Sequence, residues 1–453
     1  MRKLILTMML AIVVLTASAC GGATTTTTSI VETTLNNATI YEVNIRNYTE
    51  EGTFEAFSAH LPRLRELGVD ILWLMPIHPI SETRRIGSLG SWYAVADYFA
   101  VNPEYGTDDD FRELVDAAHA MGFSIILDWV ANHTGWDHPW ISTHPEWYTQ
   151  DDEGNITIPS GTNWNDVADL NYLNFEMRAE MLDALTYWVT EFDIDGYRCD
   201  YAGGVPRTFW ETARTELDQI KPLFWLAEDD SQFTLLENAF EANYAFAMMN
   251  TINGVGLGSH DAEDIRAMLD LNEGRYPSGR FPLYYATNHD VNAWEGSIPD
   301  LLGDGEFALA TLVFTIPGMP LIYSGQEVGL DRELRFFDKD EIDWTGWETN
   351  ATFRFYQKLA ALKKQNPALW HGLSATLDFL GNDDPDVLVY VRTSGASRVI
   401  VILNLSDTSR FLEVSLGGAE GTYRDYFTDE TITIGETMSI RLEAWDYRVY
   451  ILS

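Results

Sequence analysis

Residues 54–75, FEAFSAHLPRLRELGVDILWLM, contain the unit from which the fold can be predicted. The segment 54–67 carries apolar residues at helical spacing and ends at Gly68, a residue type that favours the end of a helix. The segment 71–75 is a short apolar run of the kind that forms a buried strand. A helix followed by a buried strand is one step of a repeated βα pattern, and repetition of that step builds a parallel sheet.

The same alternation continues on both sides of this unit. The pattern predicts eight strands, at 39–45, 71–75, 124–128, 195–199, 224–228, 244–248, 283–287 and 311–323. Further helices are expected at 109–121, 176–191, 206–220 and 353–364. Eight strands is the number that closes a (β/α)8 TIM barrel, so we expect an α/β fold with this barrel over residues 38–366.

Two regions depart from the repeated pattern. Residues 133–170 are aromatic, are interrupted by Pro and Gly, and lack helical spacing, which predicts a small loop-rich domain inserted after the third strand. Residues 367–453 contain short runs rich in Val, Ile and Tyr, typical of a separate C-terminal all-β sandwich domain.

The N-terminal segment has the composition of an export signal. Arg2 and Lys3 precede an apolar run that ends in small residues, which predicts a signal peptide over 1–19. Residues 17–20 resemble a bacterial lipobox, in which Cys20 would be lipidated; an ordinary cleavage site with an incidental cysteine is the alternative. A flexible Thr-rich tether is expected over 20–37. The predicted location is the cell envelope or cell surface, with a membrane anchor at Cys20.

The composition limits the classes of ligand. The net charge of −40 disfavours nucleic acid and anionic substrates as partners, so neutral or cationic ligands remain. The sequence is 46% hydrophobic and includes 15 Trp, so it can bury a large core and could also present flat rings to sugars. Cys199 is the only cysteine besides Cys20, and a lipidated Cys20 would exclude an intrachain disulfide.

Four of the predicted strands end in polar residues or are followed by them. In a TIM barrel the chemistry lies at the carboxyl ends of the strands, so these residues are candidates for a functional site. They are Asp128, Asn132, His133, Arg198, Asp200, Glu228, Asn288, His289 and Asp290. Ion pairs that serve only the structure are the alternative, but four such clusters on separate strands favour a functional site.

The carboxylates suit glycoside hydrolysis. That reaction needs one carboxyl group to protonate the leaving oxygen and a second to attack or to activate water, and Asp200, Glu228 and Asp290 can supply them. Arg198 precedes Asp200 by two residues, so both side chains lie on one face of the strand and Arg198 can keep Asp200 ionised. A third carboxylate would raise the pKa of Glu228 and keep it protonated as a general acid.

Five sequence blocks resemble the α-amylase family, glycoside hydrolase family 13. With the lipobox-like residues 17–20, the resemblance is to a member of bacterial lipoprotein type. The blocks are YEVNIR (41–46), GVDILWLMPIHP (68–79), DWVANH (128–133), GYRCD (196–200) and TNHD (287–290), in the order of that family. The resemblance implies a retaining hydrolase that cleaves α-1,4-glucosidic bonds in starch or maltooligosaccharides by double displacement. The partner would be an α-glucan polysaccharide or oligosaccharide.

The resemblance also implies residue roles. Asp200 would be the nucleophile that forms a covalent glycosyl intermediate, Glu228 the general acid/base, and Asp290 the carboxylate that holds and distorts the sugar. The implied sugar contacts are Tyr93, His133, Arg198 and His289. Trp136, in the insertion that the family calls domain B, is either a stacking platform for a sugar or a packing residue. A transglycosylase, a cyclomaltodextrinase-like relative and a non-catalytic glycan-binding protein on the same fold are the alternative functions.

This chain departs from the family pattern after the nucleophile. Many α-amylases have Lys and His three and four residues after it, where this chain has Gly203 and Gly204. In the family the carbonyl of that His helps to bind a structural calcium ion. Asn132 and Asp169 are the candidate calcium ligands here, but two side chains fall short of the six to eight oxygens that calcium takes. No organic cofactor is expected.

Overall fold

The structure is a computed structural model that describes residues 35–371 and 375–453. The predicted signal peptide and Cys20 lie outside the described residues, as does the predicted tether apart from residues 35–37. Leu35, near the end of that tether, is buried in the core of the barrel. No helix among the described residues is long and apolar enough to cross a bilayer.

A closed barrel of parallel strands forms the main body, which confirms the predicted TIM barrel. Its strands are β1 (Ile40–Val43), β2 (Ile71–Leu74), β3 (Ser124–Trp129), β6 (Gly196–Cys199), β7 (Phe224–Ala227), β8 (Ala242–Tyr244), β9 (Phe281–Tyr284) and β10 (Met319–Tyr323). β1 pairs with both β10 and β2, so the first and last strands close the ring. Apolar side chains of the strands and of the helices around them fill one continuous core.

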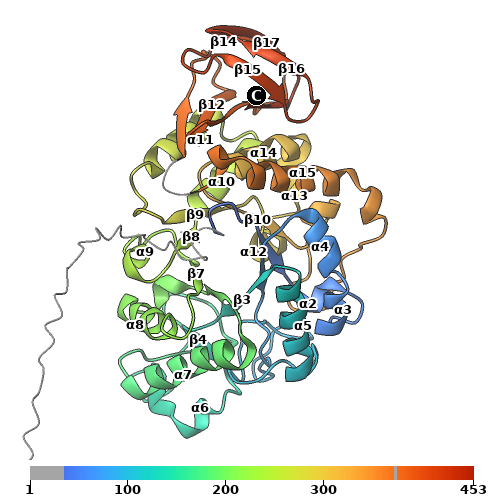
Figure 1. The fold of residues 1–453 in the computed structure, drawn as a ribbon. Coiled ribbons are helices and arrows are strands. Elements are labelled where there is room, and N and C mark those ends of the chain that lie inside the picture. The colour runs from blue at the N-terminus through green and yellow to red at the C-terminus, as the bar shows by residue number, and fades with distance from the viewer. Residues whose placement is uncertain (1–34, 372–374) are drawn as a thin grey trace, which may run out of the picture.

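The helices lie outside the barrel (Figure 1). They are α2 (Ile45–Tyr48), α3 (Phe54–Ser58), α4 (Leu61–Leu67), α5 (Asp108–Ala120), α6 (Trp140–Thr143), α7 (Phe175–Phe192), α8 (Arg207–Leu217), α9 (Leu235–Asn238), α10 (Phe246–Gly256), α11 (Ala262–Asn272), α12 (His289–Trp294), α13 (Ile298–Leu302), α14 (Glu306–Thr315) and α15 (Ala351–Gln365). The helix predicted over 54–67 is divided into α3 and α4. Pro62 stands in the first turn of α4, where its missing N–H costs no hydrogen bond.

Two predicted strands are wrong in part. The run 244–248 was expected to be a strand, but β8 ends at Tyr244 and α10 begins at Phe246. The run 311–323 was expected to be one strand, but its first residues end α14 and only Met319–Tyr323 forms β10. Both are apolar runs, and 311–323 is buried except at Pro317. Periodicity alone does not separate a buried helix from a buried strand.

The insertion after β3 is built around a short hairpin. β4 (His133–Gly135) pairs antiparallel with β5 (Val167–Asp169), and His133 lies opposite Asp169. Trp140 and Trp147 lie between β4 and β5 in the sequence. Both are buried, and their rings pack edge to face with centroids 5.0 Å apart. These two tryptophans therefore pack the insertion.

The C-terminal region is all-β, as predicted. A six-stranded sheet has the order β11-β12-β13-β18-β15-β16, and β14 pairs with β17. The strands are β11 (Thr376–Phe379), β12 (Val387–Ser394), β13 (Ser397–Asn404), β14 (Arg410–Ser415), β15 (Gly421–Asp425), β16 (Thr431–Ile434), β17 (Thr437–Leu442) and β18 (Tyr447–Leu452). Figure 1 shows these strands next to α14 and α15, at the end of the molecule opposite α6.

Buried cations join the C-terminal sheet to the barrel. Arg392 of β12 donates to the carbonyls of Thr315 and Thr376, and Lys363 of α15 donates to the carbonyl of Gly318. Burial lowers the pKa of Lys363, because the charged form loses its hydration. Backbone carbonyls thus satisfy these cations at the junction.

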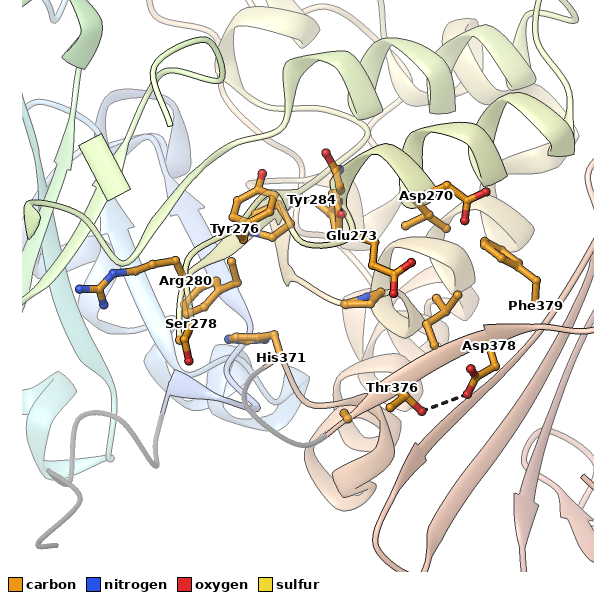
Figure 2. Close-up of a pocket in the computed structure, with 18 residues that line it drawn as sticks. Asp270, Glu273, Tyr276, Ser278, Arg280, Tyr284, His371, Thr376, Asp378 and Phe379 are labelled. Carbon is orange, nitrogen blue, oxygen red and sulfur yellow. Dashed lines mark hydrogen bonds between the residues drawn. The ribbon is translucent and has the colours of Figure 1, made fainter. Parts of the chain in front are cut away.

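A cavity of about 750 Å³ opens beside this junction (Figure 2). Glu273 and Tyr284 border it on the barrel side, Asp378 and Phe379 on the sheet side, and His371 lies between the two. The cavity adjoins the amino end of β9. It is therefore separate from the polar residues that follow the carboxyl ends of the strands.

Candidate active site

The predicted catalytic residues meet at the carboxyl end of the barrel. Asp200 follows β6, Glu228 follows β7, and Asp290 lies in the first turn of α12. The side chain of Asn288 accepts a hydrogen bond from the N–H of Val291 at 2.8 Å and so caps α12. This cap fixes the turn that carries His289 and Asp290 beside the other two carboxylates.

Arg198 connects the carboxyl groups. Its Nη1 lies 2.8 Å from Oδ1 of Asp128 and 3.0 Å from Oδ1 of Asp200, and its Nη2 lies 2.8 Å from Oε1 of Glu228. The guanidinium is fully buried, so these ion pairs are protected from solvent screening. A single cation therefore faces three carboxyl groups, and its charge balances only one of them.

Burial, together with this shortage of positive charge, shifts the pKa values of Asp200 and Glu228 upward. Burial, opposed by Arg198 and assisted by the other carboxylates, raises the pKa of Glu228 to about 8. The same causes raise the pKa of Asp200 to about 6. Between these two values Asp200 is ionised while Glu228 is protonated, which suits Asp200 to attack and Glu228 to donate a proton.

Asp128 binds residues of the site through both of its carboxylate oxygens. Its Oδ2 accepts hydrogen bonds from Nε1 of Trp73 at 3.1 Å and from the hydroxyl of Tyr93 at 3.0 Å, while its Oδ1 binds Arg198. The side chain is fully buried and does not line the cavity described below. Asp128 therefore orients Tyr93 and Arg198.

His289 is held by two carboxylates and a phenol. Its Nδ1 lies 2.5 Å from Oε1 of Glu42, and its Nε2 lies 2.8 Å from the Tyr93 hydroxyl and 3.3 Å from Oδ2 of Asp290. Burial disfavours the imidazolium, but Asp290 and Glu42 outweigh this effect and raise the pKa of His289 to about 9. Sequence reasoning missed Glu42, although a charge in the middle of the apolar strand IYEV was a usable signal.

A cavity of about 820 Å³ opens over these groups. The predicted residues that line it are Tyr93, His133, Asp200, Glu228, His289 and Asp290. Burial lowers the pKa of His133 to about 3, so this side chain is neutral and can both donate and accept a hydrogen bond.

Aromatic side chains form two walls of this cavity. Trp164 packs edge to face against Tyr201, with ring centroids 5.4 Å apart. Trp294 packs against Phe336, with ring centroids 5.3 Å apart, and Phe337 lies beside them. Sequence reasoning missed Tyr201, Trp294, Phe336 and Phe337, because nothing in their local sequence separates them from core aromatics.

Trp136 lies apart from the other predicted sugar contacts. It is absent from the lining of the cavity, its Nε1 donates to the carbonyl of Asn165 at 3.0 Å, and the guanidinium of Arg84 lies 3.6 Å from the ring centroid. The cation covers one face of the ring. This placement favours the packing interpretation of Trp136.

Gly203 and Gly204, which follow Asp200, occupy crowded positions. A Cβ at Gly203 would lie 2.3 Å from Oδ2 of Asp229, and one at Gly204 would lie 2.6 Å from Oδ1 of Asn132. Gln232 donates to the carbonyl of Gly203 at 2.9 Å. Asp229 and Gln232 therefore take the space that a longer side chain at Gly203 would need.

The candidate calcium ligands offer a poor donor set. Among residues 35–371 and 375–453, no three His, Cys, Asp or Glu side chains gather as a metal site would require. Asp169 lies opposite His133 in the β4 and β5 pair, and Asn132 contacts His133 at 3.4 Å. Calcium at Asn132 and Asp169 would need most of its oxygens from carbonyls and water. No step of the chemistry is assigned to it.

Comparisons with known proteins agree with this geometry. Residues 26–221 match the family model for the alpha amylase catalytic domain, and residues 377–449 match the model for the maltogenic amylase C-terminal domain. An alpha-amylase from Lactobacillus plantarum is 30% identical, with a TM-score of 0.81, and the match covers 93% of this chain and 100% of that one. The maltogenic alpha-amylase AmyB of Thermotoga neapolitana is 29% identical, with a TM-score of 0.83, and the match covers 92% and 99%.

One curated relative is longer than this chain. The alpha-amylase MalA of Haloarcula japonica is 28% identical over 433 residues, and the match covers 88% of this chain but 60% of that protein. The chain therefore spans less than two thirds of that relative.

Proposed function

Because the chain belongs to the α-amylase family of glycoside hydrolases, we propose that it cleaves α-1,4-glucosidic bonds of starch or maltooligosaccharides with retention of configuration. The observation that carries this proposal is the shared contact of Arg198 with Asp200 at 3.0 Å and with Glu228 at 2.8 Å. One cation brings an ionised carboxylate and a protonated carboxyl group to the same wall of a cavity that can hold sugar rings.

In the first step Glu228 donates its proton to the glycosidic oxygen while Asp200 attacks the anomeric carbon. The raised pKa of Glu228 supports its role as the proton donor near neutral pH. The bond to the leaving sugar breaks as the bond to Asp200 forms, which produces a glycosyl ester on Asp200.

In the second step the same groups exchange roles. Glu228, now a carboxylate, takes a proton from water, and the water oxygen attacks the anomeric carbon and releases Asp200. At the end of this step Asp200 is a carboxylate and Glu228 is protonated again, and the contact of Arg198 with Asp200 stabilises the departing carboxylate. Two inversions give net retention.

The remaining polar groups hold the sugar whose bond is cleaved. His133 and His289 present ring nitrogens to hydroxyl groups, Tyr93 supplies a ring face beside His289, and Asp290 binds the distorted ring. The walls at Trp164 and Trp294 would stack against neighbouring glucose units, since flat rings suit the apolar faces of pyranoses.

The proposal is tested by product analysis with purified protein. Soluble starch and maltoheptaose should release reducing sugar, and NMR of the first product should show the α anomer. The Asp200→Asn variant should lose this activity. Asp70→Asn is the matched control, because Asp70 is paired with Lys364 before β2, at the opposite end of the barrel. A β-anomeric product, or full activity of Asp200→Asn, would contradict the proposal.

The same assay separates the alternatives. A transglycosylase would form longer oligosaccharides from maltotriose, and a cyclomaltodextrinase-like enzyme would prefer cyclic dextrins to starch. A glycan-binding protein would retain starch on a column without releasing sugar. Chromatography of the oligosaccharide products identifies transglycosylation, and the relative rates on cyclic dextrins and starch identify a cyclomaltodextrinase-like enzyme. Binding of starch without any product identifies a non-catalytic protein.

We also propose that the protein is exported and anchored through Cys20. The support is the sequence of residues 1–20, with its basic start, apolar run and lipobox-like end. A surface anchor would place the enzyme where external glucans are available.

A further inference from the structure

Glu42 is a buried carboxylate beneath the candidate active site. It lies in the middle of β1, is fully buried, and does not line the cavity. Its Oε1 faces Nδ1 of His289 at 2.5 Å, whereas its Oε2 has no hydrogen-bonding partner among the described side chains and backbone. A buried carboxylate is costly unless a charge or a strong donor compensates it. His289 is the group in position to do so.

The hydrogen bonds around His289 fix its protonation. Oδ2 of Asp128 receives the hydroxyl of Tyr93, and the same carboxylate receives protons from Trp73 and Arg198, so Asp128 acts only as an acceptor. A phenol has one proton, and Tyr93 donates it to Asp128. The 2.8 Å contact between the Tyr93 oxygen and Nε2 of His289 must then use a proton on Nε2.

The other ring nitrogen is also a donor. Nδ1 of His289 faces the carboxylate of Glu42, which can only accept. Both nitrogens therefore carry protons, which is the imidazolium form.

We propose that Glu42 is a positioning residue that holds His289 as an imidazolium, with its Nε2–H fixed toward the sugar-binding cavity. The identity of the ligand in this inference rests on the proposed function. The protonation of His289 does not. Nε2 contacts the Tyr93 oxygen at 2.8 Å and lies 3.3 Å from Oδ2 of Asp290, so a sugar hydroxyl that enters here would share this charged donor with Tyr93. A neutral histidine would have a choice of two tautomers, and only one of them presents this donor.

Charged groups on four elements affect the protonation of His289. Glu42 on β1, Asp128 on β3 and Asp290 on α12 favour the imidazolium, and Arg198 on β6 opposes it. The uncharged neighbours are Trp73, with ring centroids 6.0 Å apart, Tyr93, stacked at 5.4 Å, and Phe336 at 6.3 Å.

The carboxylates raise the pKa of His289 by more than Arg198 lowers it. That guanidinium is itself engaged by three carboxyl groups, which offset its charge. The pKa of His289, raised to about 9, agrees with the hydrogen-bond count.

The direct test is an NMR titration of selectively ¹³C-labelled histidines in the full chain, with His289 assigned from the His289→Gln variant. Wild-type His289 should stay protonated through pH 8. Glu42→Gln should lower its pKa by roughly one unit or more, because a carboxylate is replaced by a neutral amide. Glu42→Asp should lower it less. Asp70→Asn, which removes a paired carboxylate at the opposite end of the barrel, should leave it unchanged.

Kinetics give a second readout. In Glu42→Gln the deprotonation of His289 should add to that of Glu228, so the fall of kcat/KM at high pH should become steeper and move to lower pH. The value of kcat should decrease about 10- to 100-fold, the effect typical of losing a supporting residue. Glu42→Asp should restore part of this loss. A merely structural role would lower the melting temperature without moving the pH profile.

Three results would overturn the inference. They are a wild-type His289 that titrates near pH 6.5, a Glu42→Gln variant with an unchanged His289 pKa, and a Glu42→Gln variant whose pH profile matches wild type. The first needs no variant, so misfolding of Glu42→Gln does not weaken the test. If the protein cleaved no glucan but His289 titrated as expected, the proposed function would fail and the assigned protonation would stand.

Discussion

Nη2 of Arg198 lies 2.8 Å from Oε1 of Glu228, inside the barrel wall and shielded from solvent. The adjacent Nη1 of the same guanidinium binds Asp200. This sharing gives the two carboxyl groups different protonation states in one small volume, because one positive charge does not offset two negative charges at low dielectric. The predictions on pH dependence and stability follow from this relation.

The activity should have a bell-shaped pH dependence. It should rise as Asp200 ionises through about pH 6 and fall as Glu228 loses its proton through about pH 8. Measurement of kcat/KM from pH 4 to 10 on a maltooligosaccharide checks this expectation. A flat profile across pH 5 to 9 would contradict the assignment of these two groups.

Glu228→Gln should lose starch hydrolysis but keep the first step with an activated substrate. A glycosyl fluoride leaves without a proton, so Asp200 can still be glycosylated, and azide can then complete the reaction without a general base. Mass spectrometry should detect the glycosyl enzyme, and added azide should yield an α-glycosyl azide.

The matched variant for that experiment is Asp290→Asn. It should lose activity on all substrates without azide rescue, because Asp290 binds the distorted ring and transfers no proton. Near-normal starch hydrolysis by Glu228→Gln would move the acid role to Asp229 or Asp230, which also line the cavity.

Glu228→Gln should also be more stable than the wild type near pH 8. The folded protein raises the pKa of Glu228 from 4.5 to about 8, so the folded state binds a proton more tightly than the unfolded state. Wild-type stability therefore decreases as the pH rises from about 4.5 through about 8, and glutamine removes this cost. We expect a gain on the order of 1 kcal/mol at pH 8 that vanishes near pH 4, measured by thermal melts.

The control for this gain is Glu241→Gln. Glu241 precedes β8 and is paired with Arg214 and Arg280, so its removal leaves two cations without their partner. This variant should lose stability. Equal shifts in both variants would show that the gain does not come from the active-site charge.

Trp294→Ala should weaken binding of glucan chains. The ring is 59% exposed, lines the cavity and is supported by Phe336. The loss of one stacking platform should raise KM about 3- to 10-fold with a smaller effect on kcat. Phe411→Ala is the control, because Phe411 is exposed on β14 of the C-terminal region. An unchanged KM for long and short substrates would exclude this platform.

Cys20→Ser should release the protein from the membrane. Metabolic labelling with a fatty acid should mark the wild type and not the variant, while starch hydrolysis per molecule stays equal. Membrane partition that persists in Cys20→Ser would show that another part of the protein carries the anchor.

The sequence determined the architecture and the carboxylates. Apolar runs of strand length alternate with helical periods, and both patterns are local, so the barrel and the end of each strand were predictable. Asp200, Glu228 and Asp290 lie at or just after the ends of predicted strands, so the rule that chemistry lies at carboxyl ends was enough to select them as candidates. Local pattern was insufficient where a run is buried on every side, as in 311–323, where helix and strand have the same composition.

Only the tertiary structure decided which side chains meet. Glu42 and His289 are 247 residues apart, and closure of the barrel brings them into contact. Trp136 and Trp294 each follow an Asn-His pair within a few residues, yet Trp294 lines the cavity and Trp136 lies against Arg84. The physical reason is that periodicity specifies which face of an element is buried. The partner across that face depends on how distant elements pack, and so do the charge of a buried group and the exposure of an aromatic ring.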